Sequence, residues 1–342
     1  MSVDDSDLAA AIHGSHPDTA TALVAERVVD GEPLEDVARD LLRAALALSG
    51  HELQGATWIH AVLSTLAAVE LIPHAGSKVV APALVGAAGF LAFARPSRHG
   101  DGVMQQVDDD ALWRSAVAAP GGWGHAILTV GHVVRAPFLG AELRDGARRY
   151  LDPPEPGPGQ DDDVLADGSM SAADVAAALA GIGSAPLVVR AGSEETRAGL
   201  ALAACELLVL APDLRGIHHL TVLREALDAP AEVRPRAMTI AARFIADGWE
   251  RARIDRRARV RPEFTEGRGE ALHADVVKEL LRVEPRPGFG HNIKLAAAVR
   301  ALEGLLPAEV HGALGRAVVA TLPTWSRSRR PWLALQAARR AV

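Results

Sequence analysis

Apolar residues recur three and four positions apart along most of the chain, and a proline or glycine usually separates one such stretch from the next. The stretch Leu34–Leu48 shows this pattern, and Gly50 follows it closely. The spacing places apolar side chains on one face of an α-helix, so it predicts a helix there. By the same criterion we expect helices over His60–Leu71, Ala172–Leu179, Glu194–Leu210, Ala231–Ile245, Ala271–Val283, Lys294–Leu306 and Ala308–Leu322.

Few segments resemble anything other than a helix. Leu187–Val189 and Val103–Val107 have some strand character, but both are short. The longest apolar stretch, Val79–Ala94, is interrupted by proline and glycine and is shorter than the roughly 20 residues of a membrane-spanning helix, so we expect a buried helix. The sequence therefore predicts an all-α protein, either a helical bundle or an α-solenoid-like array of antiparallel helix pairs.

One segment divides the chain into two halves. Asp152–Ser169 combines four prolines with an acidic run, which favours an exposed loop. A chain of 342 residues has room for one large domain or two ordinary ones. Because similar helix starts occur on both sides of the loop, we expect a single helical domain over residues 1–342 whose halves share a site.

Charge, cysteine content and the N-terminal residues argue against several kinds of partner, covalent link and targeting signal. The formal net charge is −7, from 36 basic and 43 acidic residues, so no global basic field favours nucleic acid or an anionic membrane. Cys205 is the only cysteine, which excludes an internal disulfide and a thiolate metal cluster. The N-terminal residues lack the basic and apolar regions of a secretory signal. We therefore expect a cytoplasmic protein with no membrane segment.

The histidines carry the clearest chemical signal. Four apolar helical segments each place a histidine near their start: Thr57–Leu71 with His60, Gly121–Ala136 with His125, Arg215–Leu227 with His218 or His219, and Gly288–Leu302 with His291. Imidazole is the commonest metal ligand in proteins, and facing helices of a bundle can each supply one. Each histidine is thus either a ligand or an ordinary core residue whose ring is hydrogen-bonded.

Lys294 strengthens the metal hypothesis. It lies three residues after His291, on the same helix face, within an apolar segment of a chain that has only three lysines. Burial lowers the pKa of an amine and makes it available as a base, a nucleophile or a site of carbon dioxide capture. The alternative is a lysine at a helix end whose stem is buried and whose charge reaches solvent.

Four further residues are candidates for contacts with a substrate. Trp58 and Trp123 each precede a histidine by two positions and are either aromatic walls of a pocket or core residues. His132 follows His125 by almost two helical turns and is either a general base, a partner of a ligand, or a packing residue. His218 and His219 are not separable by spacing, and we assign His218 to the metal and His219 to the substrate.

These motifs resemble a known family. His60-Ala-Val-Leu-Ser-Thr-Leu-Ala, His218-His-Leu-Thr221 and His291-Asn-Ile-Lys294 are similar to the histidine-led helix starts of the questin oxidase-like family, whose fungal members open anthraquinone rings oxidatively. The resemblance implies an all-helical oxygenase with one non-haem iron. Carried over to this sequence, it implies His60, His125, His218, His291 and a possible carboxylated Lys294 as the ligands.

The expected reaction joins dioxygen to an aromatic, polyketide-like or otherwise enolisable small molecule at Fe(II). No Gly-x-Gly-x-x-Gly motif follows a strand, so we expect no tightly bound dinucleotide. Two alternatives from other classes stay open. One is a metal-free helical binding or scaffold protein, and the other is a zinc-dependent hydrolase or lyase that uses the same histidines.

Overall fold

A computed structural model of the chain describes residues 5–96, 103–121, 124–152, 170–181, 193–212, 214–254, 274–282, 290–322 and 330–341. These residues form α-helices joined by turns and short 3-10 segments, and no strand occurs among them. The all-α prediction is therefore confirmed. Val103–Val107 has no regular structure, and Leu187–Val189 lies outside the described residues.

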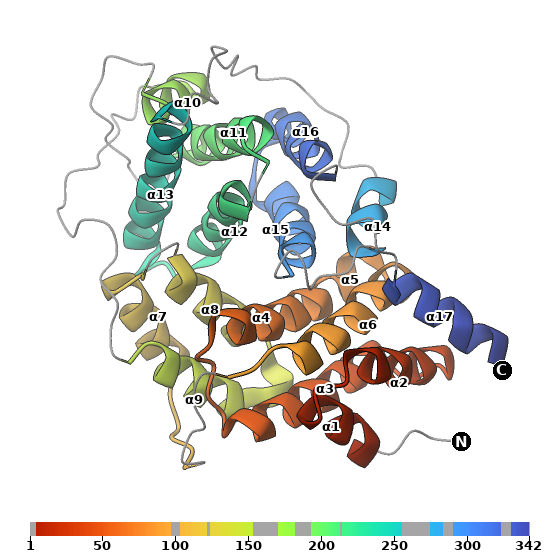
Figure 1. The fold of residues 1–342 in the computed structure, drawn as a ribbon. Coiled ribbons are helices and arrows are strands. Elements are labelled where there is room, and N and C mark those ends of the chain that lie inside the picture. The colour runs from red at the N-terminus through yellow and green to blue at the C-terminus, as the bar shows by residue number, and fades with distance from the viewer. Residues whose placement is uncertain are drawn as a thin grey trace.

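Four helices occupy the middle of the molecule (Figure 1). They are α4 (Ala56–Glu70), α8 (His125–Val134), α12 (Leu214–Asp228) and α15 (His291–Leu305). Helices α4 and α12 each pack against both α8 and α15. The first half of the chain supplies α4 and α8 and the second half supplies α12 and α15, so the centre is built where the two halves meet.

The remaining helices surround this centre. On the N-terminal side they are α1 (Asp5–His13), α2 (Pro17–Val29), α3 (Leu34–Ser49), α5 (Ile72–Ala75), α6 (Ser77–Phe93), α7 (Asp109–Ala118) and α9 (Gly140–Tyr150). On the C-terminal side they are α10 (Ala172–Leu179), α11 (Glu194–Leu210), α13 (Arg234–Ile254), α14 (Ala274–Arg282), α16 (His311–Thr321) and α17 (Arg330–Ala341). Helix α17 returns to pack on α2 and α6, which joins the end of the chain to its beginning (Figure 1).

Burial of apolar side chains explains why these helices form one array. A single apolar cluster extends from Leu8 in α1 to Ala338 in α17. The apolar stretch predicted as a buried helix forms α6, which is buried along most of its length and accommodates Pro82 in its interior. No helix among the described residues is both long and apolar enough to cross a lipid bilayer.

Local signals in the sequence also have their expected effect. Ser171 and Ser193 cap α10 and α11, because their hydroxyls accept hydrogen bonds from the backbone N–H groups of Asp174 and Thr196. Cys205 is fully buried in α11, and burial raises the pKa of its thiol. The predicted loop Asp152–Ser169 lies outside the described residues from position 153 onward.

Candidate metal centre

Each central helix brings one histidine to the same region. His60 and His218 are the fifth residues of α4 and α12, one turn inside the helix. His125 and His291 are the first residues of α8 and α15. The two halves of the chain thus contribute the same pair, a histidine one turn inside one helix and a histidine at the start of another.

Glycines allow α8 and α15 to begin at this place. Gly124 and Gly290 precede the helices in the left-handed conformation, with φ of 69° and 67°, which favours glycine. A Cβ atom on Gly290 would lie 2.4 Å from Cβ of Ser64 in α4. A Cβ atom on Gly124 would lie 2.7 Å from Val222 in α12. Ser64 and Val222 each follow a site histidine by four residues. The close packing of a helix-starting glycine against a neighbouring helix therefore occurs at equivalent positions in the two halves.

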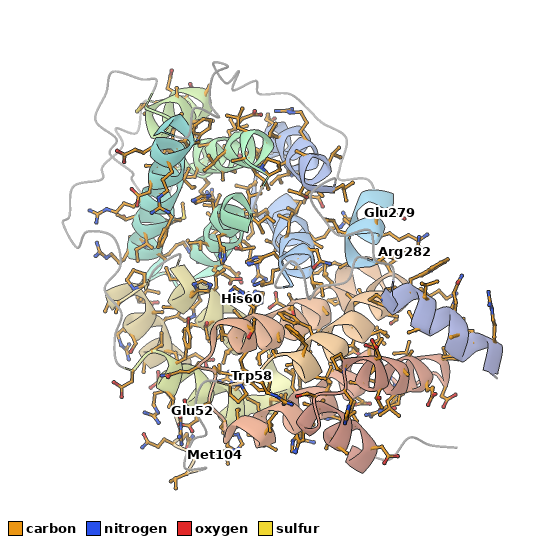
Figure 2. The ribbon with its side chains drawn as sticks, viewed as in Figure 1. Glu52, Trp58, His60, Met104, Glu279 and Arg282 are labelled. Carbon is orange, nitrogen blue, oxygen red and sulfur yellow. The ribbon has the colours of Figure 1, made fainter. Side chains whose placement is uncertain are left out.

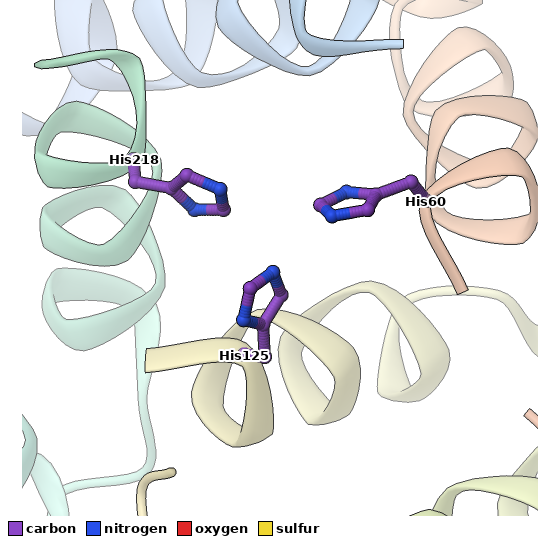
Figure 3. A group of neighbouring side chains, drawn as sticks. All are labelled: His60, His125 and His218. Carbon is purple, nitrogen blue, oxygen red and sulfur yellow. The ribbon is translucent and has the colours of Figure 1, made fainter. Parts of the chain in front are cut away.

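The four imidazole rings lie close to one another. The centroid of His60 is 5.1 Å from that of His125, 6.0 Å from that of His218 and 4.9 Å from that of His291. The His218 ring lies 4.8 Å from His125 and 4.5 Å from His291. Figure 3 shows His60, His125 and His218 pointing toward one another from three helices. One ring nitrogen from each of these three lies within 4.8 Å of the others.

These separations suit rings arranged around one ion. A metal–nitrogen bond of about 2 Å puts an imidazole centroid about 3 Å from the metal, so rings on a common ion have centroids about 4.5 to 6.5 Å apart. All the ring separations given above fall in this range. The chemistry of the donors agrees, because imidazole nitrogens suit zinc, iron, copper and nickel.

Lys294 lies inside the same cluster. Its Nζ is 2.7 Å from Nδ1 of His60, and only 1% of the residue is exposed. Burial lowers the pKa of the amine to about 7. A neutral Lys294 can accept a hydrogen bond from the Nδ1–H group of His60, which leaves the Nε2 lone pair of that ring free to bind a cation.

Three of the site histidines, His60, His218 and His291, are held in the uncharged form that binds metals. Burial lowers the pKa of His60, and the charge of Lys294 adds to this effect. Burial also lowers the pKa of His218 and His291 well below the usual value. Among the described residues, the buried polar atoms without a hydrogen-bond partner include Nδ1 of His291 and the hydroxyl of Thr129, one turn after His125. Such atoms are expected where a ligand completes a site.

The other predicted residues lie elsewhere. Trp58 is buried, donates from Nε1 to the carbonyl of Glu52, and lies on the opposite side of α4 from His60 (Figure 2). His219 packs against α13, where a Cβ atom on Gly248 would be 2.6 Å from its ring. His132 lies two turns along α8 from His125, with its Nδ1 2.6 Å from a carboxylate oxygen of Glu70. Trp123 lies outside the described residues.

Sequence reasoning missed the charged groups around His132. Glu70, Arg135, Arg224 and Glu225 form a largely buried ion-pair network at the other ends of α4, α8 and α12. Their signal was available, because Arg224 and Glu225 are adjacent charges inside the apolar helix after His218. Charged residues are almost never buried unless they are paired.

Comparisons of the chain with protein-family models, with curated proteins and with solved structures found no match. The geometry of the histidine cluster is therefore the main structural indication of function.

Proposed function

We propose that the protein binds one transition-metal ion through His60, His125 and His218, with His291 as a further donor. The observation that supports this proposal is the convergence of four imidazoles from four helices. An apolar interior gains nothing from four adjacent neutral rings whose nitrogens all need partners. A cation in their midst would satisfy several of these nitrogens at once.

We further propose that the ion is Fe(II) and that the protein is an oxygenase. The resemblance to the questin oxidase-like family supports this choice, and the imidazole nitrogens of the triad are among the donors that iron accepts. When bound, a ferrous ion supplies redox chemistry toward dioxygen and Lewis acidity toward an enolate or phenolate oxygen. Neutral ligands leave the charge of such an ion uncompensated, so an anionic form of an aromatic or enolisable substrate is favoured beside it.

The chain contributes a largely buried site and a controlled proton. Lys294, His218 and His291 are almost completely buried, whereas His60 and His125 are partly exposed, so bulk water is excluded from one part of the cluster only. Lys294 holds or releases a proton at Nζ near neutral pH because burial lowers its pKa to about 7. The neutral amine can also add carbon dioxide, which forms an N–C bond, releases one proton and gives a carbamate whose oxygens can bind the cation. No tightly bound dinucleotide is part of the proposal, and a reducing compartment such as the cytoplasm suits a ferrous site.

Aerobic and anaerobic assays with defined metals test the proposal. Protein purified without oxygen should bind one Fe(II) per chain, and should consume dioxygen only when a phenolic or enolisable compound such as an anthraquinone is added. His125→Ala should abolish both binding and oxygen consumption, whereas His13→Ala, on a histidine remote from the site, should change neither. Activity of the zinc form that is indifferent to dioxygen would point to a hydrolase or lyase. Failure to bind any transition metal would leave a helical binding protein and would refute the proposal.

A further inference from the structure

The three helices that carry His60, His125 and His218 meet a second time at a cluster of charges. The charged residues follow the histidines by six to ten positions, which is about 9 to 15 Å along a helix at 1.5 Å per residue. They are Glu70 on α4, His132 on α8 and Arg135 directly after that helix, and Arg224, Glu225 and Asp228 on α12.

Glu70 connects α4 to both neighbours. One carboxylate oxygen lies 2.6 Å from Nδ1 of His132 on α8. The other accepts a hydrogen bond of 2.8 Å from Arg224 on α12 and lies 3.3 Å from Nε of Arg135 at the C-terminal end of α8. A single carboxylate therefore contacts both of the other histidine-bearing helices.

Glu225 connects the remaining pair of helices, α8 and α12. Only 1% of the residue is exposed, and its carboxylate accepts hydrogen bonds from Arg224 at 2.6 Å and from Arg135 at 2.7 Å. Arg135 reaches the second carboxylate oxygen of Glu225 at 2.6 Å and Asp228 at 3.1 Å. A Cβ atom on Gly131 would lie 2.0 Å from Glu225, so α8 and α12 approach this closely only because residue 131 has no side chain.

Stability alone is a poor explanation for this network. The desolvation of buried ions offsets much of their attraction, and well-packed apolar residues are often as stabilising. What charge-assisted hydrogen bonds add is direction, because a guanidinium fixes the angle and separation of the carboxylates that it contacts. Each pair among α4, α8 and α12 has such a contact.

We propose that the ion-pair network of Glu70, His132, Arg135, Arg224 and Glu225 positions His60, His125 and His218 for metal binding by fixing the three helices in register. This inference rests on the proposed metal site. The network residues are positioning residues, since none of them touches the histidine cluster in the contacts that the structure describes.

Cobalt(II) binding to the full-length protein tests the positioning role, because the visible absorption of cobalt reports the geometry of its ligands. Glu225→Gln should still bind one cobalt, with a dissociation constant raised at least tenfold and altered absorption bands. The matched control is Glu32→Gln, which removes the ion pair of Glu32 with the buried Arg27 of α2, far from the site. The control should lower the melting temperature and leave the cobalt affinity and absorption bands at wild-type values.

The outcomes separate the two proposals. Glu225→Gln protein that loses stability but keeps the wild-type affinity and bands would overturn the positioning role. Wild-type protein that binds no cobalt would instead refute the metal site itself. If Glu225→Gln does not fold, His132→Gln is compared in the same way, because it removes the contact of His132 with Glu70 on α4 and its longer approach to Glu225 on α12 and keeps the arginine contacts. Wild-type cobalt affinity and bands in that variant would equally overturn the inference.

Discussion

Lys294 should make the stability of the folded protein depend on pH. Its pKa falls from 10.5 to about 7 on burial, so the unfolded chain holds a proton that the folded protein releases between these values. The free energy of unfolding of the metal-stripped protein should therefore rise as pH increases from about 7 to 10.5, by about 5 kcal/mol in total.

Lys294→Met isolates this contribution. The variant lacks the titrating amine, so its stability should be higher than that of the wild type at neutral pH and the difference should vanish near pH 10.5. Urea denaturation across this pH range measures the effect. Parallel pH profiles for the two metal-stripped proteins would contradict the burial of an ionisable amine beside His60.

The adjacent residues His218 and His219 give a matched pair of variants. His218 faces the other site histidines, whereas His219 packs against Gly248 of α13. His218→Ala should abolish metal binding, and His219→Ala should retain it while losing about 1 to 3 kcal/mol of stability. Titration calorimetry with Fe(II) or cobalt(II) distinguishes them. Retained binding in His218→Ala together with lost binding in His219→Ala would reverse the assignment.

The sequence was informative about which residue types converge and less so about where each side chain points. His60, His125, His291 and Lys294 were recognisable because polar residues stood at the starts of apolar helices. The choice between His218 and His219 needed the rotation of α12 about its axis, which depends on its packing against α13. The place of Trp58 in the core on the far side of α4 depends in the same way on the neighbours of that helix.

At the scale of the element, the start of α15 is constrained by both its backbone conformation and its packing. Gly290 has a φ of 67° and touches Ser64, so Gly290→Ala combines an unfavourable backbone conformation with a steric clash. We expect a loss of at least about 2 kcal/mol in stability and weaker metal binding, because His291 follows directly.

Gly304 is the control in the same helix. It lies near the other end of α15, and a Cβ atom there would meet nothing within 4 Å. Gly304→Ala should leave metal affinity unchanged and raise stability by up to about 1 kcal/mol. Thermal unfolding and metal titration of both variants provide the comparison. Equal effects of the two substitutions would contradict the special role of the α15 start.

The apolar periodicity predicted where the helices lie, but it predicted their first and last residues less well. Helices α10 and α11 match the predicted ranges Ala172–Leu179 and Glu194–Leu210 because serine caps mark their starts. Helix α13 continues beyond the predicted Ile245 to Ile254, since Trp249 extends the apolar face and donates a hydrogen bond to the carbonyl of Ala203 in α11. Such a tertiary contact is not visible in local sequence.

At the scale of the whole molecule, the site depends on contacts between distant parts of the chain. His60 and Lys294 are 234 residues apart, and Glu70 and Arg224 are 154 apart. Periodicity does not determine such pairings, because any apolar helix face can pack against several others. Similar helix starts in the two halves predicted that both halves contribute to one site, and the histidine cluster does contain residues from both halves.

A bound ion should stabilise the whole fold, because its ligands come from both halves of the chain. Binding to the folded state alone adds about 2.7 kcal/mol when the free metal concentration is 100 times the dissociation constant. Thermal unfolding with increasing cobalt(II) should therefore show a steadily rising melting temperature. The His125→Ala variant should show no such rise, and an equal rise in that variant would indicate binding elsewhere.

X-ray absorption spectroscopy of the iron-loaded wild-type protein examines the central claim most directly, because it reports the atoms that surround the metal. The account predicts one iron per chain with nitrogen or oxygen neighbours at about 2.0 to 2.2 Å and the outer-shell scattering of at least three imidazoles. An iron surrounded by oxygen ligands without imidazole scattering, or a protein that retains no iron, would contradict it.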